Sequence, residues 1–240
     1  MKSAICILLC AALCAMVLSS CSTPSAPSES MECGLFVPIL NAYAELERSD
    51  FEVYDEDLIG GLNFASYKSK RDRTTIVYAF YDLNQDNTKE LLVGTRVKLS
   101  DSEYESVYGI FALHNGIPAP VFQEETGNSI YLCMDDKGHP VIECLWGRMD
   151  VAEDFFYTID DKGNLKALEK LFTNGCDRTD EEKPVYDRAR EMDGEQIDIT
   201  EEEYCSLVWK YGGLGYGIGR GEPVREITLA WQPIHTIRPQ

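Results

Sequence analysis

The chain has 240 residues, which suits one or two domains, and its hydrophobic fraction of 44% is that of a folded globular protein. Asp and Glu number 41 against 22 Lys and Arg, which gives a formal net charge of −19. So acidic a protein lacks the cationic surface that attracts nucleic-acid backbones and anionic lipid headgroups, and we expect no nucleic acid among its partners.

The first 20 residues have the pattern of a signal peptide. Residues 4–18 are apolar, a stretch with the length of a signal-peptide core and too short for a membrane span. The stretch runs into Leu18-Ser19-Ser20-Cys21, which resembles the lipobox of bacterial lipoproteins. That resemblance implies cleavage before Cys21, acylation of its thiol with chains such as palmitate, and anchoring at the extracellular face of the cell membrane. The alternative is an ordinary secretory signal with an incidental cysteine.

The rest of the chain divides by composition into a tether and a domain. Residues 21–33 are rich in Ser and Pro and cannot bury apolar surface, so they predict a solvated tether after lipidated Cys21. Residues 34–240 have the composition of a single domain. Apolar residues at spacings of three and four predict a helix over 34–49.

From residue 74 onward the sequence becomes typical of β-structure. Short β-branched and aromatic runs alternate with turn residues, which predicts an antiparallel meander. The expected strands cover residues 75–81, 91–97, 106–113, 118–123, 129–134, 140–146, 155–159 and 165–172. The sequence Asp-Asp-Lys-Gly occurs at 135–138 and again at 160–163, and its glycine suits the left-handed position of a hairpin turn.

The acidic segment 173–199 is expected to be irregular, and a last strand is expected over 224–233. Between them, Thr200 and Glu203 form the pattern of a capping box at the start of a helix over 201–211, and Gly212 suits its end. The predicted fold class is therefore α+β, an antiparallel β-meander packed by an N-terminal and a C-terminal helix.

Oxygen-bearing side chains alternate along the segment from residue 82 to residue 90. Asp82, Asn84, Asp86 and Glu90 stand at its first, third, fifth and ninth positions, and Thr88 at the seventh offers a backbone carbonyl. Calcium binds six to eight such oxygens, so the pattern predicts a structural calcium ion in the loop between two strands. Donors that are all oxygen disfavour zinc and copper. The alternative is an acidic turn capped by its own Asp and Asn side chains.

This segment resembles the D-x-D-x-D-G-x-x-E-L loop of calcium-binding strand-loop-strand repeats, and its first half resembles an EF-hand loop. Asn84 replaces an acid of that pattern and Asn87 replaces its glycine. Val93 stands where an EF-hand carries its bidentate glutamate. The flanking segments are predicted strands and not helices, so a helix-loop-helix EF-hand is rejected.

A wider resemblance covers most of the chain. The lipobox, the tether, the segment YAFYDLNQDNTKELLVG and the late segment ITEEEYCSLVWKY are similar to a family of lipoproteins of gut Firmicutes without an assigned activity. That resemblance implies a fold and an extracellular location, and it implies no reaction.

Beyond Cys21, an odd number of cysteines remains after the signal peptide, and their spacing matches no zinc motif. They are Cys33, Cys133, Cys144, Cys176 and Cys205. We expect them to be small buried side chains. The alternative for two of them is a Cys133–Cys144 disulfide across a hairpin.

These patterns predict a membrane-anchored, non-enzymatic lipoprotein that binds an unidentified extracellular ligand or protein. The alternative is a small extracellular hydrolase acting on glycans or peptides. His114, His139 and His235 are far apart in the sequence and no nucleophile motif is present, so no catalytic residue is predicted. An enzyme would gather titratable side chains in one concave pocket, whereas a binding module would present an open aromatic or polar face.

Overall fold

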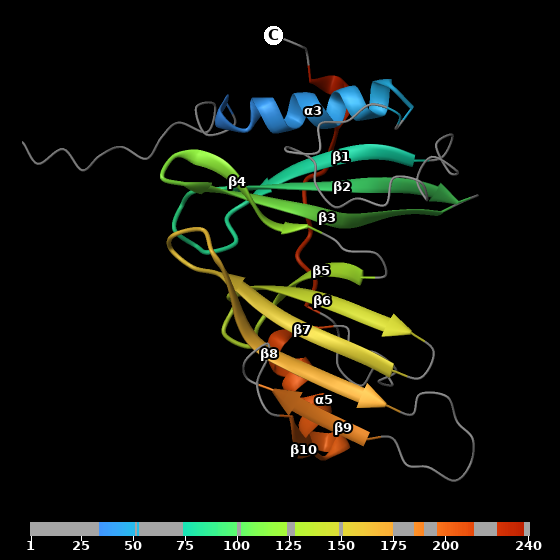
Figure 1. Ribbon diagram of the computed structural model, residues 1–240, viewed down its shortest axis with the longest axis vertical. Helices are drawn as coiled ribbons and strands as arrows, with labels where there is room; N and C mark the ends of the chain where they lie inside the picture. Colours follow the sequence, from blue (N-terminus) through green and yellow to red (C-terminus); the bar gives the residue numbers. More distant parts are fainter. Residues whose placement is uncertain are drawn as a thin grey trace, which may run out of the picture.

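The computed structural model describes residues 34–50, 52, 74–99, 102–123, 128–148, 151–174, 185–189, 196–213 and 225–237. These residues form mainly antiparallel β-structure with two α-helices, a broadly α+β fold (Figure 1). The predicted signal peptide, the tether and Cys21 lie outside the described residues, as do Cys33 and Cys176. No helix in the described part of the chain is long and apolar enough to cross a membrane.

The described residues contain two α-helices and eleven strands. The helices are α3 (Val37–Arg48) and α5 (Glu201–Tyr211), and a short 3-10 helix, η2 (Ile234–Thr236), lies near the end. The strands are β1 (Thr74–Tyr81), β2 (Glu90–Leu99), β3 (Ser102–His114), β4 (Ile117–Gln123), β5 (Asn128–Met134), β6 (Pro140–Arg148), β7 (Val151–Ile159), β8 (Leu165–Asn174), β9 (Val185–Ala189), β10 (Ile197–Ile199) and β11 (Gln232–Pro233).

The strands form two antiparallel half-sheets that meet at a narrow seam. The first half-sheet consists of β1 to β4 and the second of β5 to β10, and within each the strands pair with their neighbours in the sequence. Between β3 and β5 a single residue pair, Val107 with Ile130, joins the two halves. The half-sheets are stacked along the long axis of the molecule (Figure 1).

Alternation along the strands separates the buried side chains into three clusters. In β2, Leu91 and Val93 belong to a cluster that includes residues of α3, whereas Leu92 between them belongs to a central cluster. In β7, Tyr157 belongs to the central cluster and Phe156 to a third cluster that includes residues of α5. This division follows from the period of two in a strand, which sends successive side chains to opposite faces.

Local sequence signals define the ends of α5. The Thr200 side chain accepts a hydrogen bond from the Glu203 backbone N–H, and the Glu203 carboxylate accepts one from the Thr200 N–H, so the predicted capping box is confirmed. Gly212 ends the helix with φ 71°, the left-handed conformation that the sequence predicted. Tyr204, Val208 and Tyr211 of α5 are buried.

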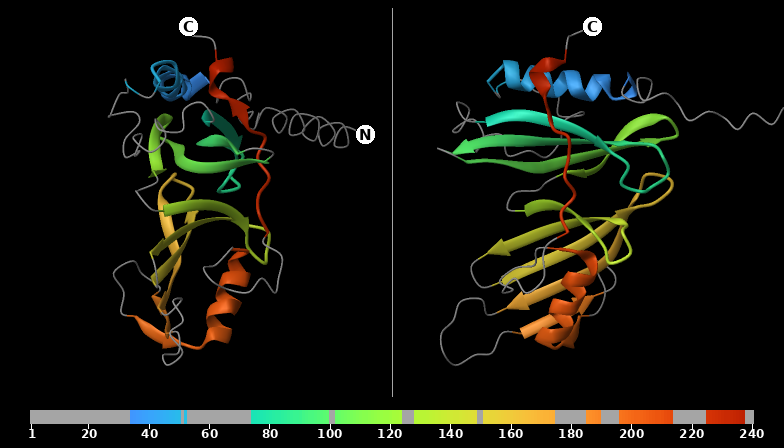
Figure 2. Two further views of the ribbon diagram at one scale, coloured as in Figure 1. Left: turned by 90° about the vertical axis from the view of Figure 1, so that its right-hand side faces the viewer. Right: turned by 180° about the vertical axis from the view of Figure 1, so that it is seen from behind.

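Two sequence predictions about the C-terminal third were wrong. The acidic segment 173–199, expected to be irregular, contains β9 and β10, because Tyr186 and Arg188 on β9 find partners on distant elements. The strand expected over 224–233 is paired only near its ends, by a bridge between Cys133 and Glu226 and by β11 against β1. Residues 225–237 instead run along both half-sheets, from the end that carries α5 to the end that carries α3 (Figure 2).

The alternative of a Cys133–Cys144 disulfide is also wrong. Both residues are buried and neither forms a disulfide. In the β5–β6 pairing, Cys133 lies opposite Val141 and Cys144 lies opposite Ile130, so the two thiols are several residues out of register. Their burial agrees with the expectation that they act as small apolar side chains.

Candidate functional site

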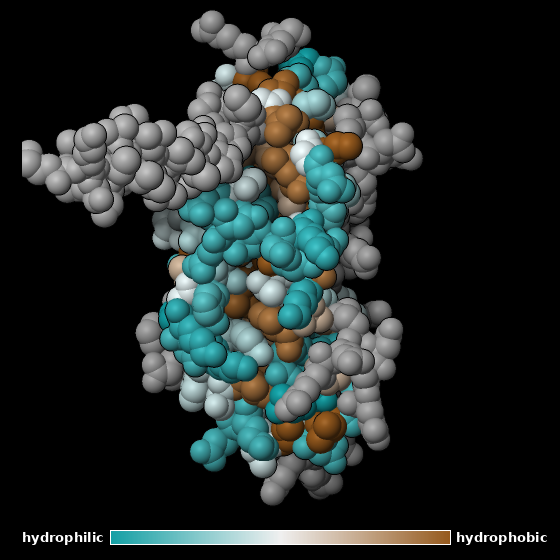
Figure 3. All heavy atoms as spheres, turned by 90° about the vertical axis from the view of Figure 1, so that its left-hand side faces the viewer, coloured by the Kyte–Doolittle hydropathy of each residue, from teal (hydrophilic) through white to brown (hydrophobic). Residues whose placement is uncertain are grey.

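Four chain reversals gather at one end of the strands. They are the β1–β2 loop (82–89), the β3–β4 turn at Asn115 and Gly116, the β5–β6 turn (135–139) and the β7–β8 turn (160–164). All four lie on the left-hand side of Figure 1. Viewed onto this side, the molecule presents a hydrophilic band across its middle (Figure 3). The antiparallel pattern explains the arrangement, because alternate connections of a meander fall at the same end.

Hydrogen bonds to Asp82 organise the β1–β2 loop. Its carboxylate accepts from the backbone N–H groups of Asp86, at 3.1 Å, and Asn87, at 2.9 Å. The Asp86 carboxylate in turn accepts from the Thr88 N–H at 2.6 Å. Asn87 has φ 69°, the conformation for which the usual pattern employs glycine, so asparagine fills this position as the sequence indicated.

Glu90, the first residue of β2, carries a buried carboxyl group directly after this loop. Its side chain is 3% exposed and its Oε2 accepts a hydrogen bond of 2.7 Å from the Leu83 N–H. Burial raises the pKa of Glu90 to about 7, aided by the negative charges of Asp86 and Asp82 and opposed by backbone hydrogen bonds. The end of the loop therefore holds a carboxyl group whose ionised form is destabilised.

The repeated Asp-Asp-Lys-Gly turns have the same hydrogen bonds, as the sequence repeat suggested. Asp135 Oδ1 accepts from the N–H groups of Lys137 and His139, each at 2.8 Å. Asp160 Oδ1 accepts from the N–H groups of Lys162, at 2.9 Å, and Asn164, at 2.8 Å. Their closing glycines, at positions 138 and 163, have φ 83° and φ 79°. Partial burial raises the pKa of Asp135, but these hydrogen bonds outweigh it and hold the pKa values of both aspartates below their usual range.

The β1–β2 loop contacts both of these turns. The Asn84 amide donates to the Asp160 carbonyl at 3.3 Å, and the Gln85 amide donates to the Gly138 carbonyl at 3.1 Å. The loop also inserts Leu83, 2% exposed, into the central cluster. A loop of the first half-sheet is thereby fixed to the second half-sheet at three points.

A cavity of about 320 Å³ opens beside the loop. Four of the five predicted calcium ligands line it, Asn84, Asp86, Thr88 and Glu90, whereas Asp82 does not. Asp161, from the second Asp-Asp-Lys-Gly turn, lines it as well. The sequence did not indicate Asp161, because its proximity to the loop depends on how the two half-sheets meet. The repeat of the turn was the only signal at this position.

In the described residues, no three His, Cys, Asp or Glu side chains are close enough together to hold a metal ion. The carboxylates of Asp82 and Asp86 point to backbone N–H groups of their own loop, and Glu90 points to Leu83. The donor set nevertheless fits a hard cation, since the residues that line the cavity offer carboxylate, amide and hydroxyl oxygens.

The three histidines, which the sequence did not single out as catalytic, have local structural partners. His114 Nε2 lies 2.8 Å from the Gly163 carbonyl oxygen, and His139 Nδ1 lies 3.1 Å from the Asp135 carboxylate. His235 Nδ1 lies 3.7 Å from the Glu47 carboxylate. Burial and the nearby Glu143 and Glu226 charges raise the pKa of the Cys133 thiol, which disfavours the reactive thiolate.

Comparison with protein-family models, curated proteins and solved structures gives no match to this chain.

Proposed function

We propose that this protein is a lipoprotein anchored at the extracellular face of the cell membrane by acyl chains on Cys21. The support lies in the apolar run 4–18, the Leu18-Ser19-Ser20-Cys21 sequence and the tether 21–33. Two or three acyl chains anchor stably, because each buried CH₂ contributes about 0.8 kcal/mol. Cys21→Ala should release the protein from the membrane fraction and abolish labelling by a palmitate analogue. Unchanged labelling would contradict the anchor.

Within the domain 34–240, the two helices brace the antiparallel sheet from separate positions. Tyr43 of α3 contacts the ring of Phe111 on β3 at a centroid distance of 6.2 Å. Tyr211 of α5 stacks on Phe156 of β7 at 4.8 Å. Each helix thus supports one half-sheet, and the seam between them depends on the β1–β2 loop and the C-terminal segment.

The β1–β2 loop carries a structural calcium ion in this proposal. The buried Glu90 carboxyl group, directly after a loop that contains Asp82 and Asp86, is the observation that supports it most strongly. Three carboxylates at one tight loop repel one another, and a divalent cation removes that repulsion. Asn84 and the Thr88 carbonyl would complete the set of oxygen ligands. Asp82 already fixes the loop conformation at the proposed calcium site through its hydrogen bonds from backbone N–H groups. The ion would therefore stabilise the seam between the half-sheets.

Terbium, a luminescent substitute for calcium, tests this site directly in the full chain. Tyr81 precedes the loop and should sensitise terbium luminescence, which calcium should displace and magnesium should displace poorly. Asp82→Asn with Asp86→Asn should remove the signal. A control double variant, Glu201→Gln with Glu202→Gln, removes the same charge from exposed positions on α5 and should retain it. Equal signals from the two double variants would show that terbium binds elsewhere.

The protein acts by binding an extracellular ligand or partner and has no catalytic role in this proposal. The hydrogen-bonding partners of His114 and His139, the Glu47 carboxylate near His235 and the raised pKa of Cys133 support that reading. One observation favours a second candidate, a small hydrolase acting on glycans or peptides: Asp86, Glu90 and Asp161 line one cavity. If that candidate is correct, the wild-type chain should hydrolyse a glycan or peptide substrate. Glu90→Gln should abolish this activity, and Glu202→Gln should leave it intact.

A further inference from the structure

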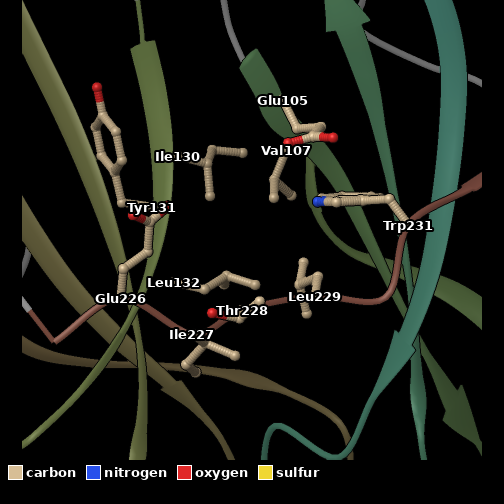
Figure 4. Close-up of a pocket in the computed structure, with 10 residues that line it drawn as sticks. All are labelled: Glu105, Val107, Ile130, Tyr131, Leu132, Glu226, Ile227, Thr228, Leu229 and Trp231. Carbon is tan, nitrogen blue, oxygen red and sulfur yellow. The ribbon is translucent and has the colours of Figure 1, made fainter. Parts of the chain in front are cut away.

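A second cavity lies at the seam between the half-sheets, away from the β1–β2 loop (82–89), which we call the acidic loop. The C-terminal segment crosses the seam there: the Ile227 N–H donates to the Leu132 carbonyl at 2.8 Å, and Gln232 pairs with Tyr78 on β1. Between these two attachments the segment encloses a cavity of about 220 Å³ with β3 and β5. Figure 4 shows the side chains that line it.

Apolar and aromatic side chains line this cavity together with polar ones, of which two, Glu105 and Glu226, are carboxylates. Val107 from β3, Ile130 from β5 and Leu229 from the crossing segment point into it (Figure 4). The indole of Trp231 reaches in from the crossing segment, with Glu105 on one side of the ring plane and Leu229 on the other (Figure 4). Glu226 lies at the opposite end of the cavity from Trp231 (Figure 4).

The indole is held in place by the neighbouring strand. A Cβ atom added to Gly94 on β2 would lie 3.1 Å from Trp231 Cη2, so the ring packs closely on the backbone at this glycine. The aromatic wall is therefore positioned before any ligand enters, which reduces the ordering cost of binding.

The electrostatics of the cavity favour a cation. Glu105 forms an ion pair with Arg96, whose Nε lies 2.9 Å from Glu105 Oε1. Glu226 forms no ion pair with any residue of the described ranges, and no Lys, Arg or His side chain lines the cavity. With a chain charge of −19 around it, an anionic ligand would be repelled.

We propose that this cavity binds a compact organic cation of the alkylammonium class. The positive charge would lie between the Trp231 indole at one end of the cavity and Glu226 at the other, and the alkyl groups would contact Val107, Ile130 and Leu229 (Figure 4). An indole is the best aromatic partner for such a cation, and desolvation strengthens the attraction. The volume is below the roughly 300–1,000 Å³ of drug-sized sites, which selects a small ligand.

The same chemistry already holds an ammonium group elsewhere in this protein. The Lys170 Nζ lies 4.6 Å from the ring centroid of Phe155 and 4.5 Å from that of Phe172. Glu153 lies 3.5 Å from the same nitrogen. Aromatic rings and one carboxylate thus surround an ammonium group elsewhere in this fold, and the seam cavity offers an indole and a carboxylate to a ligand from outside.

This inference rests on the proposed ligand-binding function and specifies its ligand class. Calorimetric titration of the full chain with choline, and with dimethylbutanol, in which carbon replaces the charged nitrogen, tests it. We expect choline to bind about ten-fold more tightly than the alcohol. Equal affinities would overturn the proposal. N-acetyl-lysine amide as a third probe distinguishes a free alkylammonium ligand from the lysine side chain of a partner, because the tighter of the two probes identifies the source.

Two variants locate the binding. Glu226→Gln should weaken choline binding about three-fold or more, and Trp231→Leu about five-fold or more. Glu202→Gln, which removes the same charge from exposed α5, should leave the affinity within about two-fold. Choline binding unchanged in Glu226→Gln, a surface variant that keeps the fold, would refute this cavity as the site.

Saturating calcium separates this inference from the proposed function. Choline affinity should be the same with and without calcium, because the acidic loop is a different site. Competition between choline and calcium would overturn the proposal for the seam cavity and would show that choline binds at the acidic loop. If choline fails to bind while calcium still stabilises the chain, the seam proposal is wrong and the calcium proposal stands.

Discussion

The side-chain amide of Asn84 donates a hydrogen bond to the backbone carbonyl of Asp160, 3.3 Å away and 76 residues later in the chain. Asn84 belongs to the first half-sheet and Asp160 to the second. A single residue pair, Val107 with Ile130, links β3 to β5 at the seam, so contacts of this kind contribute strongly to how the halves are held together. The acidic loop thus connects the two half-sheets, and a cation bound there would stabilise their contact.

Replacing Glu90 by glutamine should have opposite effects in chelator and in calcium. The folded-state pKa of Glu90 is raised from 4.5 to about 7, so ionisation destabilises the fold, fully above pH 7 and not at all below about pH 4.5. In chelator at pH 8, Glu90→Gln should therefore raise the free energy of unfolding by up to about 3 kcal/mol. In calcium the gain should shrink or reverse, because a ligand is lost.

Urea denaturation of both proteins, at pH 8 and at pH 5 with chelator, measures this effect. The advantage of the glutamine variant should fall as the pH falls from 8 to 5. If the variant is less stable than wild type in chelator at pH 8, the ionised Glu90 carboxylate does not destabilise the folded state.

The hydrogen bond beneath α5 should contribute measurably to stability. The Tyr204 hydroxyl donates to the buried Asp154 carboxylate. Tyr204→Phe removes that donor and should cost about 1–3 kcal/mol. Tyr78→Phe is the matched control, since the Tyr78 hydroxyl donates to Gln232 at an exposed position and its loss should cost less. Equal urea midpoints for the two variants would contradict a stabilising role for the buried bond.

The capping box of α5 predicts both a mutational and a pH effect. Thr200→Ala should cost about 1 kcal/mol. The hydrogen bonds from Thr200 lower the pKa of Glu203, so their stabilisation is present above the ordinary glutamate pKa and is lost as the pH falls through the lowered value. Helical circular dichroism followed through acid unfolding should show a wild-type advantage over Thr200→Ala at neutral pH that narrows in acid. A stability difference between the two proteins that does not change with pH would show that the Glu203 carboxylate does not contribute to the capping effect.

The buried thiols should be unreactive in the native state. Cys133 and Cys144 are 0% and 3% exposed, and the pKa of Cys133 is raised by burial. At pH 8 a thiol reagent should modify both slowly, and denaturant should make both react at the rate of a free peptide thiol. Peptide mapping after brief alkylation assigns the modified residues. Rapid native labelling of Cys133, or a Cys133–Cys144 disulfide in the map, would contradict the described packing.

Local signals allowed much of the fold to be predicted from the sequence. Thr200, Glu203 and Gly212 define α5 through bonds within a few residues of one another, and the glycines of the repeated turns define two hairpins. β9 was missed because its pairing relies on distant partners, such as Arg188 with Glu169 on β8. The segment 225–233 has the composition of a strand, yet it crosses between half-sheets and pairs only near its ends.

The candidate site was likewise predictable only where its structure depends on residues close together in the sequence. The loop conformation follows from Asp82 and Asn87 and was predictable from the pattern of oxygens. Asp161 and the Gln85–Gly138 contact were not, because they arise where two hairpins distant in the sequence meet. The seam cavity has the same origin, since Trp231 meets Val107 and Ile130 only in the folded chain.

A thermal melt of the full chain with calcium, magnesium or chelator tests the central claim most directly. Extracellular calcium sites have dissociation constants of roughly 10⁻⁴–10⁻³ M. Calcium at ten times that constant should add about 1.4 kcal/mol, which raises the midpoint by about 3–5 °C for a chain of this size. Magnesium should add little, and Asp82→Asn with Asp86→Asn should abolish the calcium effect while Glu201→Gln with Glu202→Gln retains it. A wild-type midpoint that calcium does not raise, or a rise that persists in the Asp82 and Asp86 double variant, would show that the loop is an acidic turn without an ion.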